Sequence, residues 1–240
     1  MPPPGYEPFL RAICENPQDD TVRLAYADWL TENGDEKRAE FIRVQVERAR
    51  LRAEGQDSDP LRTRDLELRA GHGVKWQHEL PRLRGVSWQR FWRGFVSGAT
   101  VVTWQSYDRR ADSLFAATPI QFLTVSRGFG TNAERFAASK YLTQLIGLTI
   151  LDVFSGWEAY SVCQTLPPRV LEWVEVRLPP SQELAEHSAQ VLGSAVCFRK
   201  TATRLRVRGE VPTRAAAALR AALGDRVSWC PAAEPNQTRS

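Results

Sequence analysis

A repeated pattern of short apolar runs organises the second half of this chain. Six runs have an apolar–x–apolar core, and their cores begin at Ala99, Leu123, Leu148, Val174, Leu205 and Val227. Successive cores are 22 to 31 residues apart, and helix-like segments lie between them. Alternating apolar residues are typical of strands, and short equal crossovers between strands indicate a parallel sheet with right-handed connections. The sequence therefore predicts alternating helices and strands over residues 96–240.

The first 55 residues predict a small, purely helical domain. A first helix is expected from Pro8 to about Glu15, and Asp19 can cap a second one. Asn33-Gly34 then ends the second helix, and Asp35 can cap a third. The second helix has one apolar stripe, formed by Val22, Ala25, Tyr26, Trp29 and Leu30.

Charged residues of this region are expected largely to face solvent. They are Glu32, Glu36, Arg38, Glu40, Arg43, Glu47 and Arg48. Asp28 is the one polar residue flanked by the apolar stripe, and it can bond backbone amides or an arginine of the neighbouring helix. Both features predict a structural role for these helices.

The segment LAYADWLTENGDEKRAEFIRVQ, residues 24–45, closely resembles the repeat-companion domain of bacterial leucine-rich-repeat-like proteins. The resemblance implies a helical companion domain at 1–55, then a joint at 56–95 with a short helix and an aromatic and arginine cap. A degenerate leucine-rich-repeat-like solenoid with a parallel sheet would follow at 96–240. The fullest repeat motif is LIGLTILDV, at residues 145–153.

The main rival is a doubly wound α/β sheet, which usually carries a glycine-rich phosphate loop. The one candidate for such a loop is SRGFGTNAERF at 126–136, where Gly128 and Gly130 stand between a strand and a helix. It lacks the third glycine of the dinucleotide motif and the lysine of a Walker loop. We therefore expect these glycines to turn the chain, and we expect no cofactor.

Charge is divided unevenly along the chain. Residues 1–70 hold 11 Lys+Arg and 15 Asp+Glu, a net charge of −4. Because the whole chain has a net charge of +4, residues 71–240 carry a net charge of +8. The basic part can face an acidic partner or nucleic acid, or it can pack against the acidic helices of the same chain. The sequence leaves these alternatives open.

Two arginine-rich segments are the candidate partner-binding surfaces. RLRGVSWQRFWRGF, at 82–95, interleaves arginines with aromatic residues, and RLRVRG, at 204–209, puts three arginines on one face of a strand. The first segment can cap the open end of the sheet, anchor a protein interface or bind single-stranded nucleic acid. The candidate residues are Arg84, Trp88, Arg90, Phe91, Trp92, Arg93, Arg204, Arg206 and Arg208.

Catalytic and metal sites find little support in the sequence. His72 and His78 lack further ligands at a recognised spacing, so no metal site is expected. Cys163 and His187 could form a thiol–imidazole pair only if the fold joined them. The four cysteines contain no CxxC pair, and no apolar run approaches the length of a membrane helix. We therefore expect a cytoplasmic protein with reduced thiols and no membrane association.

The resemblance assigns no catalytic residue, so the leading expectation is a non-enzymatic adaptor that binds another protein, within a bacterial defence or signalling system. The alternatives are a subunit associated with nucleic acid through the arginine and tryptophan surfaces, and a hydrolase or transferase with an unrecognised site.

Overall fold

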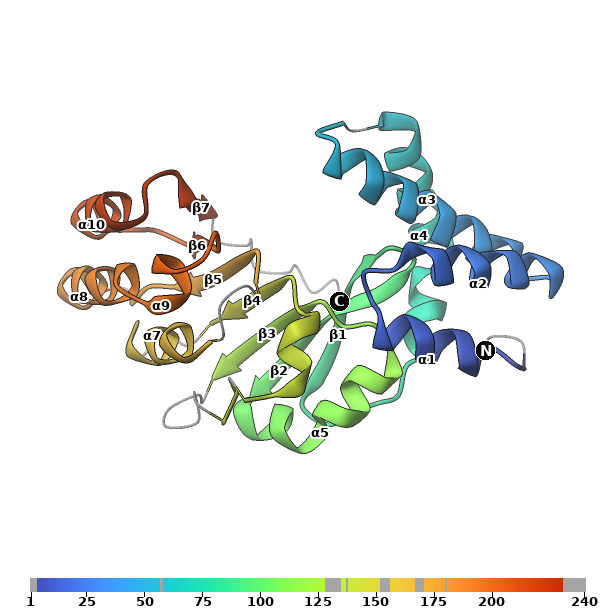
Figure 1. Ribbon diagram of the computed structural model, residues 1–240, viewed down its shortest axis with the longest axis horizontal. Helices are drawn as coiled ribbons and strands as arrows, with labels where there is room; N and C mark the ends of the chain where they lie inside the picture. The colour runs from blue at the N-terminus through green and yellow to red at the C-terminus, as the bar shows by residue number, and fades with distance from the viewer. Residues whose placement is uncertain are drawn as a thin grey trace, which may run out of the picture. The chain divides into compact units, whose positions relative to one another are not determined.

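The computed structural model shows a mixed α/β fold, with a helical N-terminal region followed by a mostly parallel seven-stranded sheet (Figure 1). The sequence predicted this mixed α/β class with a parallel sheet, but with six strands. The chain divides into two compact units: unit 1 comprises residues 1–99 and 110–121, and unit 2 comprises residues 100–109 and 122–240. The structure describes residues 4–56, 58–127, 135–136, 138–151, 156–166, 171–179 and 181–230.

Unit 1 begins with four helices whose ends follow the capping signals of the sequence. They are α1 (Glu7–Glu15), α2 (Asp20–Glu32), α3 (Glu36–Ala53) and α4 (Asp59–His78). The Asp19 carboxylate accepts a hydrogen bond from the Thr21 amide at 2.8 Å, and the Asp35 carboxylate accepts one from the Arg38 amide at 3.2 Å. Gly34 has a positive φ of 82°, as expected of a residue that ends a helix. The predicted start and stop of α2 and the start of α3 are confirmed.

The main core of unit 1 lies between α1, α2 and α3. Phe9, Tyr26 and Trp29 contact one another with ring centroids 5.5 to 5.8 Å apart. The buried residues of this cluster are Ile13, Tyr26, Ala27, Leu30, Ala39, Ile42, Val46 and Phe95. At the helix surface, Arg43 Nη2 lies 2.7 Å from Asp28 Oδ1, so Asp28 does bond an arginine of the neighbouring helix.

Two arginines of unit 1, Arg23 and Arg48, are buried, and a third, Arg38, is half-buried. Arg23 is fully buried in α2, whereas Ala25 of the expected stripe is exposed. Arg23 can be buried because its Nη2 donates to the Pro17 carbonyl oxygen at 2.7 Å. Arg48 of α3 is also buried, against Asp65, and Arg38 lies over aromatic rings. Of the seven charged residues expected largely to face solvent, Arg48 is the one that is buried, because its guanidinium finds an acceptor inside the fold.

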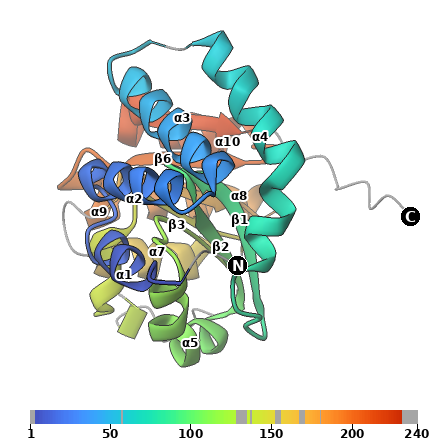
Figure 2. The same ribbon diagram turned by 90° about the vertical axis from the view of Figure 1, so that its right-hand side faces the viewer.

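α4 is much longer than the short helix expected after residue 56. Its 20 residues continue through Gly71 and Gly73 to His78. Gly73 is buried, and a Cβ atom there would lie 3.6 Å from the Phe91 ring, an ordinary van der Waals distance. α3 leads to the loop at the top of Figure 2 and α4 returns from it, and the two helices pack together.

Most of the segment at 82–95 forms strand β1 (Val86–Trp92) and the turn after it, whereas the strand predicted around Ala99 is β2 (Phe95–Thr103). They are neighbours in the sheet and are joined by Arg93 and Gly94, with φ values of 51° and 84°. Positive φ at both central residues is typical of the type I′ hairpin turn. β2 continues into α5 (Trp104–Ala117).

The remaining strands are β3 (Phe122–Arg127), β4 (Gly147–Ile150), β5 (Trp173–Arg177), β6 (Arg204–Arg208) and β7 (Val227–Cys230). They pair in parallel and follow one another across the sheet in chain order. Leu123 pairs with Leu148, Leu148 with Val174, Val174 with Leu205, and Leu205 with Val227. The alignment of the apolar–x–apolar cores therefore predicted the register of these strands correctly.

Helices of unit 2 line up on one side of β4 to β7 (Figure 1): α7 (Gly156–Thr165), α8 (Gln182–Gly193) and α10 (Thr213–Leu223). α8 packs against both α7 and α10. The single turn α9 (Val196–Arg199) follows α8, and the 3₁₀ helix η3 (Gly224–Arg226) follows α10. The inward strand residues Leu148, Val174, Val176, Leu205 and Val207 are completely buried.

Part of the expected helix at 131–142 and the Gly128–Gly130 turn lie outside the described residues. Where the description resumes, Lys140–Gln144 form a 3₁₀ helix, η2, ahead of β4.

Candidate functional site

The arginine and aromatic residues at 82–95 separate into two groups with different surroundings. Phe91 packs into a core of unit 1, edge-on to Phe41 with ring centroids 5.3 Å apart. Arg93 Nη1 donates to the Gln18 carbonyl oxygen at 3.0 Å and lies 3.4 Å from Asp20 Oδ1. Phe91 and Arg93 therefore stabilise unit 1, whatever else they contact.

Trp92 is half-buried, with the Arg93 guanidinium 5.8 Å from its ring centroid. Arg90 is exposed and has a positive φ of 42°, which interrupts the regular alternation of β1. This irregular backbone changes the direction of side chains along the strand, so simple alternation does not describe which of them share a face.

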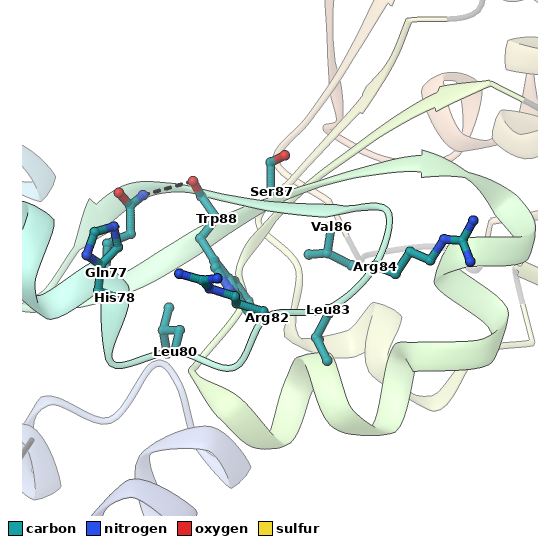
Figure 3. A pocket seen from close by; sticks show the side chains of 9 residues that line it. All are labelled: Gln77, His78, Leu80, Arg82, Leu83, Arg84, Val86, Ser87 and Trp88. Carbon is teal, nitrogen blue, oxygen red and sulfur yellow. Dashed lines mark hydrogen bonds between the residues drawn. The ribbon is translucent and has the colours of Figure 1, made fainter.

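Trp88 and Arg84 line a pocket of about 510 Å³ at the end of α4 (Figure 3). Figure 3 shows the Arg82 guanidinium beside the Trp88 side chain and facing Gln77 and His78, whereas Arg84 points the other way. The full lining is Gln77, His78, Leu80, Arg82, Leu83, Arg84, Val86, Ser87 and Trp88. The pocket is thus basic and aromatic, and Arg82 lies closer to Trp88 than Arg84 does.

Hydrogen bonds hold the walls of this pocket. Gln77 Nε2 donates to the Trp88 carbonyl oxygen at 2.8 Å, which ties α4 to β1. Trp88 Nε1 donates to the Pro81 carbonyl oxygen at 3.0 Å, which fixes the indole against the loop. A cation beside a fixed aromatic ring suits a planar or anionic group, because the ring offers a stacking surface and the guanidinium a charge.

The second candidate surface is the outer face of β6, in unit 2. Arg204, Arg206 and Arg208 occupy alternate positions of this strand and share one face, as the sequence predicted. Arg208 Nε and Nη2 lie 2.6 and 2.5 Å from Glu175 Oε1 of β5. The Arg206 guanidinium lies 4.2 Å from the centroid of the Trp173 ring. Arg204 is the most exposed of the three, so two of the three cations already have contacts inside the sheet.

Trp173 organises the centre of this face. Its indole stacks with Phe122 of β3, with ring centroids 6.2 Å apart. It also lies across Gly147 of β4, where a Cβ atom would overlap the indole. Trp173 and Glu175 were not among the predicted site residues, although their positions in the aligned repeats, each adjoining an apolar core residue, could have identified them.

The two candidate surfaces belong to different units: Arg84 to Arg93 lie in unit 1, and Arg204 to Arg208 lie in unit 2.

The thiol–imidazole pair considered from the sequence does not form between the residues proposed. Cys163 of α7 is completely buried, and its thiol forms a hydrogen bond with the free thiol of Cys197 on α9. His187, in contrast, is exposed on α8. The hydrogen bond with Cys197, together with burial, raises the pKa of Cys163 well above its ordinary value. A thiol in this state is a poor nucleophile at neutral pH.

Alkylation should therefore separate the cysteines of the native protein. With iodoacetamide at pH 7.5, the half-buried Cys230 should be modified at least about tenfold faster than Cys163. Raising the pH to 9 should not make Cys163 reactive towards iodoacetamide, because its elevated pKa in the folded state still keeps the thiol protonated. Peptide mass spectrometry measures both rates, and unfolding in urea provides the fully reactive control. Equal rates at the two thiols in the native protein would contradict the burial and pairing of Cys163.

None of the helices in the described part of the chain has both the length and the apolar character needed to cross a membrane. Within the same ranges, no three His, Cys, Asp or Glu side chains gather in a way that could hold a metal ion.

Comparison with known proteins does not assign a function, so the functional argument depends on the residues of this chain. No protein-family model, curated protein or solved structure matches this chain.

Proposed function

We propose that this protein is a non-enzymatic interaction module, an adaptor or recognition subunit of a bacterial multi-protein system. In this proposal, a repeat-companion domain precedes degenerate leucine-rich-repeat-like units, and the protein works in the cytoplasm. The sheet of unit 2 binds an acidic segment of another protein through the face that carries Trp173 and Arg204.

The strand order of unit 2 is the observation that carries this proposal. β3 to β7 follow one another without any reversal, so right-handed crossovers all place their connections on the same side of the sheet. A doubly wound sheet would reverse its order and would have a ligand crevice at the reversal. A one-sided arrangement instead leaves the other face to present alternating side chains, as repeat proteins do on their binding surfaces.

The chemistry of this face supports an acidic protein partner. Its described positions on β5 and β6 hold four arginines and one glutamate: Arg177, Arg204, Arg206, Arg208 and Glu175. Glu175 is paired with Arg208, so the remaining charge is positive. The cations that this face offers to a partner include the exposed Arg204 and the half-buried Arg206, which lies over the buried Trp173, and arginine is among the residue types that dominate protein–protein binding energies.

A pair of matched charge reversals tests the proposal. The variant Arg204→Glu/Arg206→Glu changes the outer sheet face, and the control Arg214→Glu/Arg220→Glu changes helix α10 by the same charge. The control is closely matched because Arg214 is exposed like Arg204, and Arg220 lies 5.4 Å from the Trp229 ring much as Arg206 lies over Trp173.

Partners should first be captured with the wild-type protein from the native host and identified by mass spectrometry. The affinity of the purified partner should fall at least about tenfold for the sheet variant and stay within about twofold for the helix variant. Equal affinity of both variants would remove the sheet face from the proposal.

A second candidate function is single-stranded nucleic-acid binding. It is favoured because Arg82 lies beside Trp88 in the pocket at the end of α4 (Figure 3). Binding of a fluorescent oligonucleotide should then weaken steeply with salt and be lost in Trp88→Ala. A protein that binds no oligonucleotide even at low salt excludes this function.

A further inference from the structure

Unit 1 contains a second pocket, which shares Leu80 with the pocket at the end of α4 but is otherwise lined by different residues. Its volume is about 350 Å³, near the lower end of the range of about 300–1,000 Å³ for small-molecule sites. Aromatic side chains form much of its wall, namely Tyr6, Tyr26, Trp76 and Phe95. α5 closes another part of the wall through Ser113 and Ala117. A pocket with these walls suits a small ligand with an apolar body.

The positively charged group in this pocket is the guanidinium of Arg38, on α3. Its central carbon lies 4.8 Å from the Trp76 ring centroid and 5.5 Å from the Phe95 ring centroid. The residue keeps some exposed surface, but Nη1 is shielded from solvent, and no group in the described part of the chain accepts a hydrogen bond from it. Burial lowers the pKa of Arg38 from its ordinary value, which reflects the loss of hydration around the charge.

A shielded guanidinium nitrogen without an acceptor is uncommon, because buried polar groups are nearly always hydrogen-bonded. Cation–π contacts hold the flat faces of the group but do not satisfy its N–H donors, which point outward in the guanidinium plane. The natural acceptor for this planar fork is a carboxylate. A single ligand can satisfy both features, with a carboxylate that accepts a hydrogen bond from the unsatisfied nitrogen and an apolar body that packs against the aromatic wall.

We propose that this pocket binds a small organic monocarboxylate with an aromatic or branched apolar body, whose carboxylate accepts a hydrogen bond from Arg38 Nη1. The site lies entirely within unit 1 and does not depend on what the sheet of unit 2 binds.

The other polar groups of the pocket narrow the ligand class. Glu79 also lines it, and its negative charge, which together with that of Asp35 acts favourably on the Arg38 guanidinium, leaves room for no more than one carboxylate on the ligand. Thr118 Oγ1 already donates to the Val96 carbonyl oxygen at 2.6 Å. Burial raises the pKa of Tyr26 to about 12, so its phenol keeps its proton at neutral pH and remains a hydrogen-bond donor. The pocket thus favours one anionic group on an otherwise apolar molecule.

Acid and amide pairs test this inference on the full-length protein. The probes are phenylacetate, indole-3-acetate, 4-methylpentanoate and octanoate, each compared with its own primary amide by isothermal titration and thermal shift. At least one acid should bind in the millimolar range or tighter and raise the Tm, and its amide should bind at least about tenfold more weakly, because an amide lacks the negative charge that pairs with the guanidinium.

Three variants locate the binding. Arg38→Gln should abolish the preference for acid over amide, and Ala117→Phe should block both by filling the pocket. Arg43→Gln is the matched control, because Arg43 is on the same helix but pairs with Asp28 at the surface. It should leave binding unchanged.

The proposal is overturned if no acid binds the wild-type protein better than its amide, or if Arg38→Gln keeps the acid preference. If Arg38→Gln fails to fold, the acid–amide comparison on the wild type and the Ala117→Phe variant still decide. A preference for acid that survives Ala117→Phe would place the binding elsewhere.

Discussion

Replacing Asp65 by alanine is expected to lower the free energy of unfolding by about 3–5 kcal/mol. Asp65 of α4 is only 1% exposed and accepts hydrogen bonds from Arg48 and from Gln45, the latter at 2.7 Å. Arg69 Nη2 also lies 3.3 Å from Asp65 Oδ2. Removing the carboxylate leaves the buried Arg48 charge without its counter-ion, which costs far more than an exposed ion pair contributes.

Asp59→Ala is the control for this prediction. Asp59 lies on the same helix and is also paired with an arginine, Arg62, at 3.0 Å, but its side chain is 84% exposed. Its loss should cost no more than about 1 kcal/mol. Urea unfolding followed by far-UV circular dichroism measures both variants, and similar midpoints would refute the importance of the buried pair.

The second large effect is expected from Gly94→Ala, which should cost about 2–5 kcal/mol in total. Gly94 has a φ of 84°, and a Cβ atom there would lie 2.5 Å from Ile42 Cγ1 and 2.7 Å from Ile42 Cα. The Gly94 amide also donates to Gln45 Oε1 at 2.8 Å, so a shift of the hairpin turn would break this bond to α3. Backbone strain and a steric clash therefore add at one position.

Gly34→Ala separates these two contributions. Gly34 has nearly the same φ, 82°, but nothing lies within 4 Å of a Cβ atom added to it. It should lose only the strain energy, about 1–2 kcal/mol. Thermal unfolding compares the two variants directly. If Gly94→Ala proved no worse than Gly34→Ala, the close approach of the hairpin to α3 would carry no energetic weight.

The parts of the fold that were predictable depend on local patterns. The cores aligned at Leu148, Val174 and Leu205 became paired residues of adjacent strands, because each strand must turn its apolar residues to the same buried side. The caps at Asp19 and Asp35 were predictable for the same reason, since a capping side chain acts within one helical turn.

The errors arose where distant residues override a local signal. The sequence predicted only a short helix in this region, yet α4 continues through Gly71 and Gly73 because its packing against α3 outweighs the low helix propensity of glycine. β1 was missed because its tryptophans and arginines do not alternate between apolar and polar, and Arg90 has a positive φ. The candidate surface was also divided unexpectedly, because Phe91 and Arg93 contact residues of α1–α4 and their connecting loops.

By itself, the sequence determined helices α1 to α3, the positions of strands β2 to β7 and the register of β3 to β7, because the periodicity of apolar residues acts over a few positions. Only the tertiary structure decided which arginines are wholly or partly shielded from water. Arg48 meets Asp65 from another helix, and Arg38 lies between rings supplied by α4 and β2. A charge can leave water only where such partners converge, and their convergence depends on segments far apart in the chain.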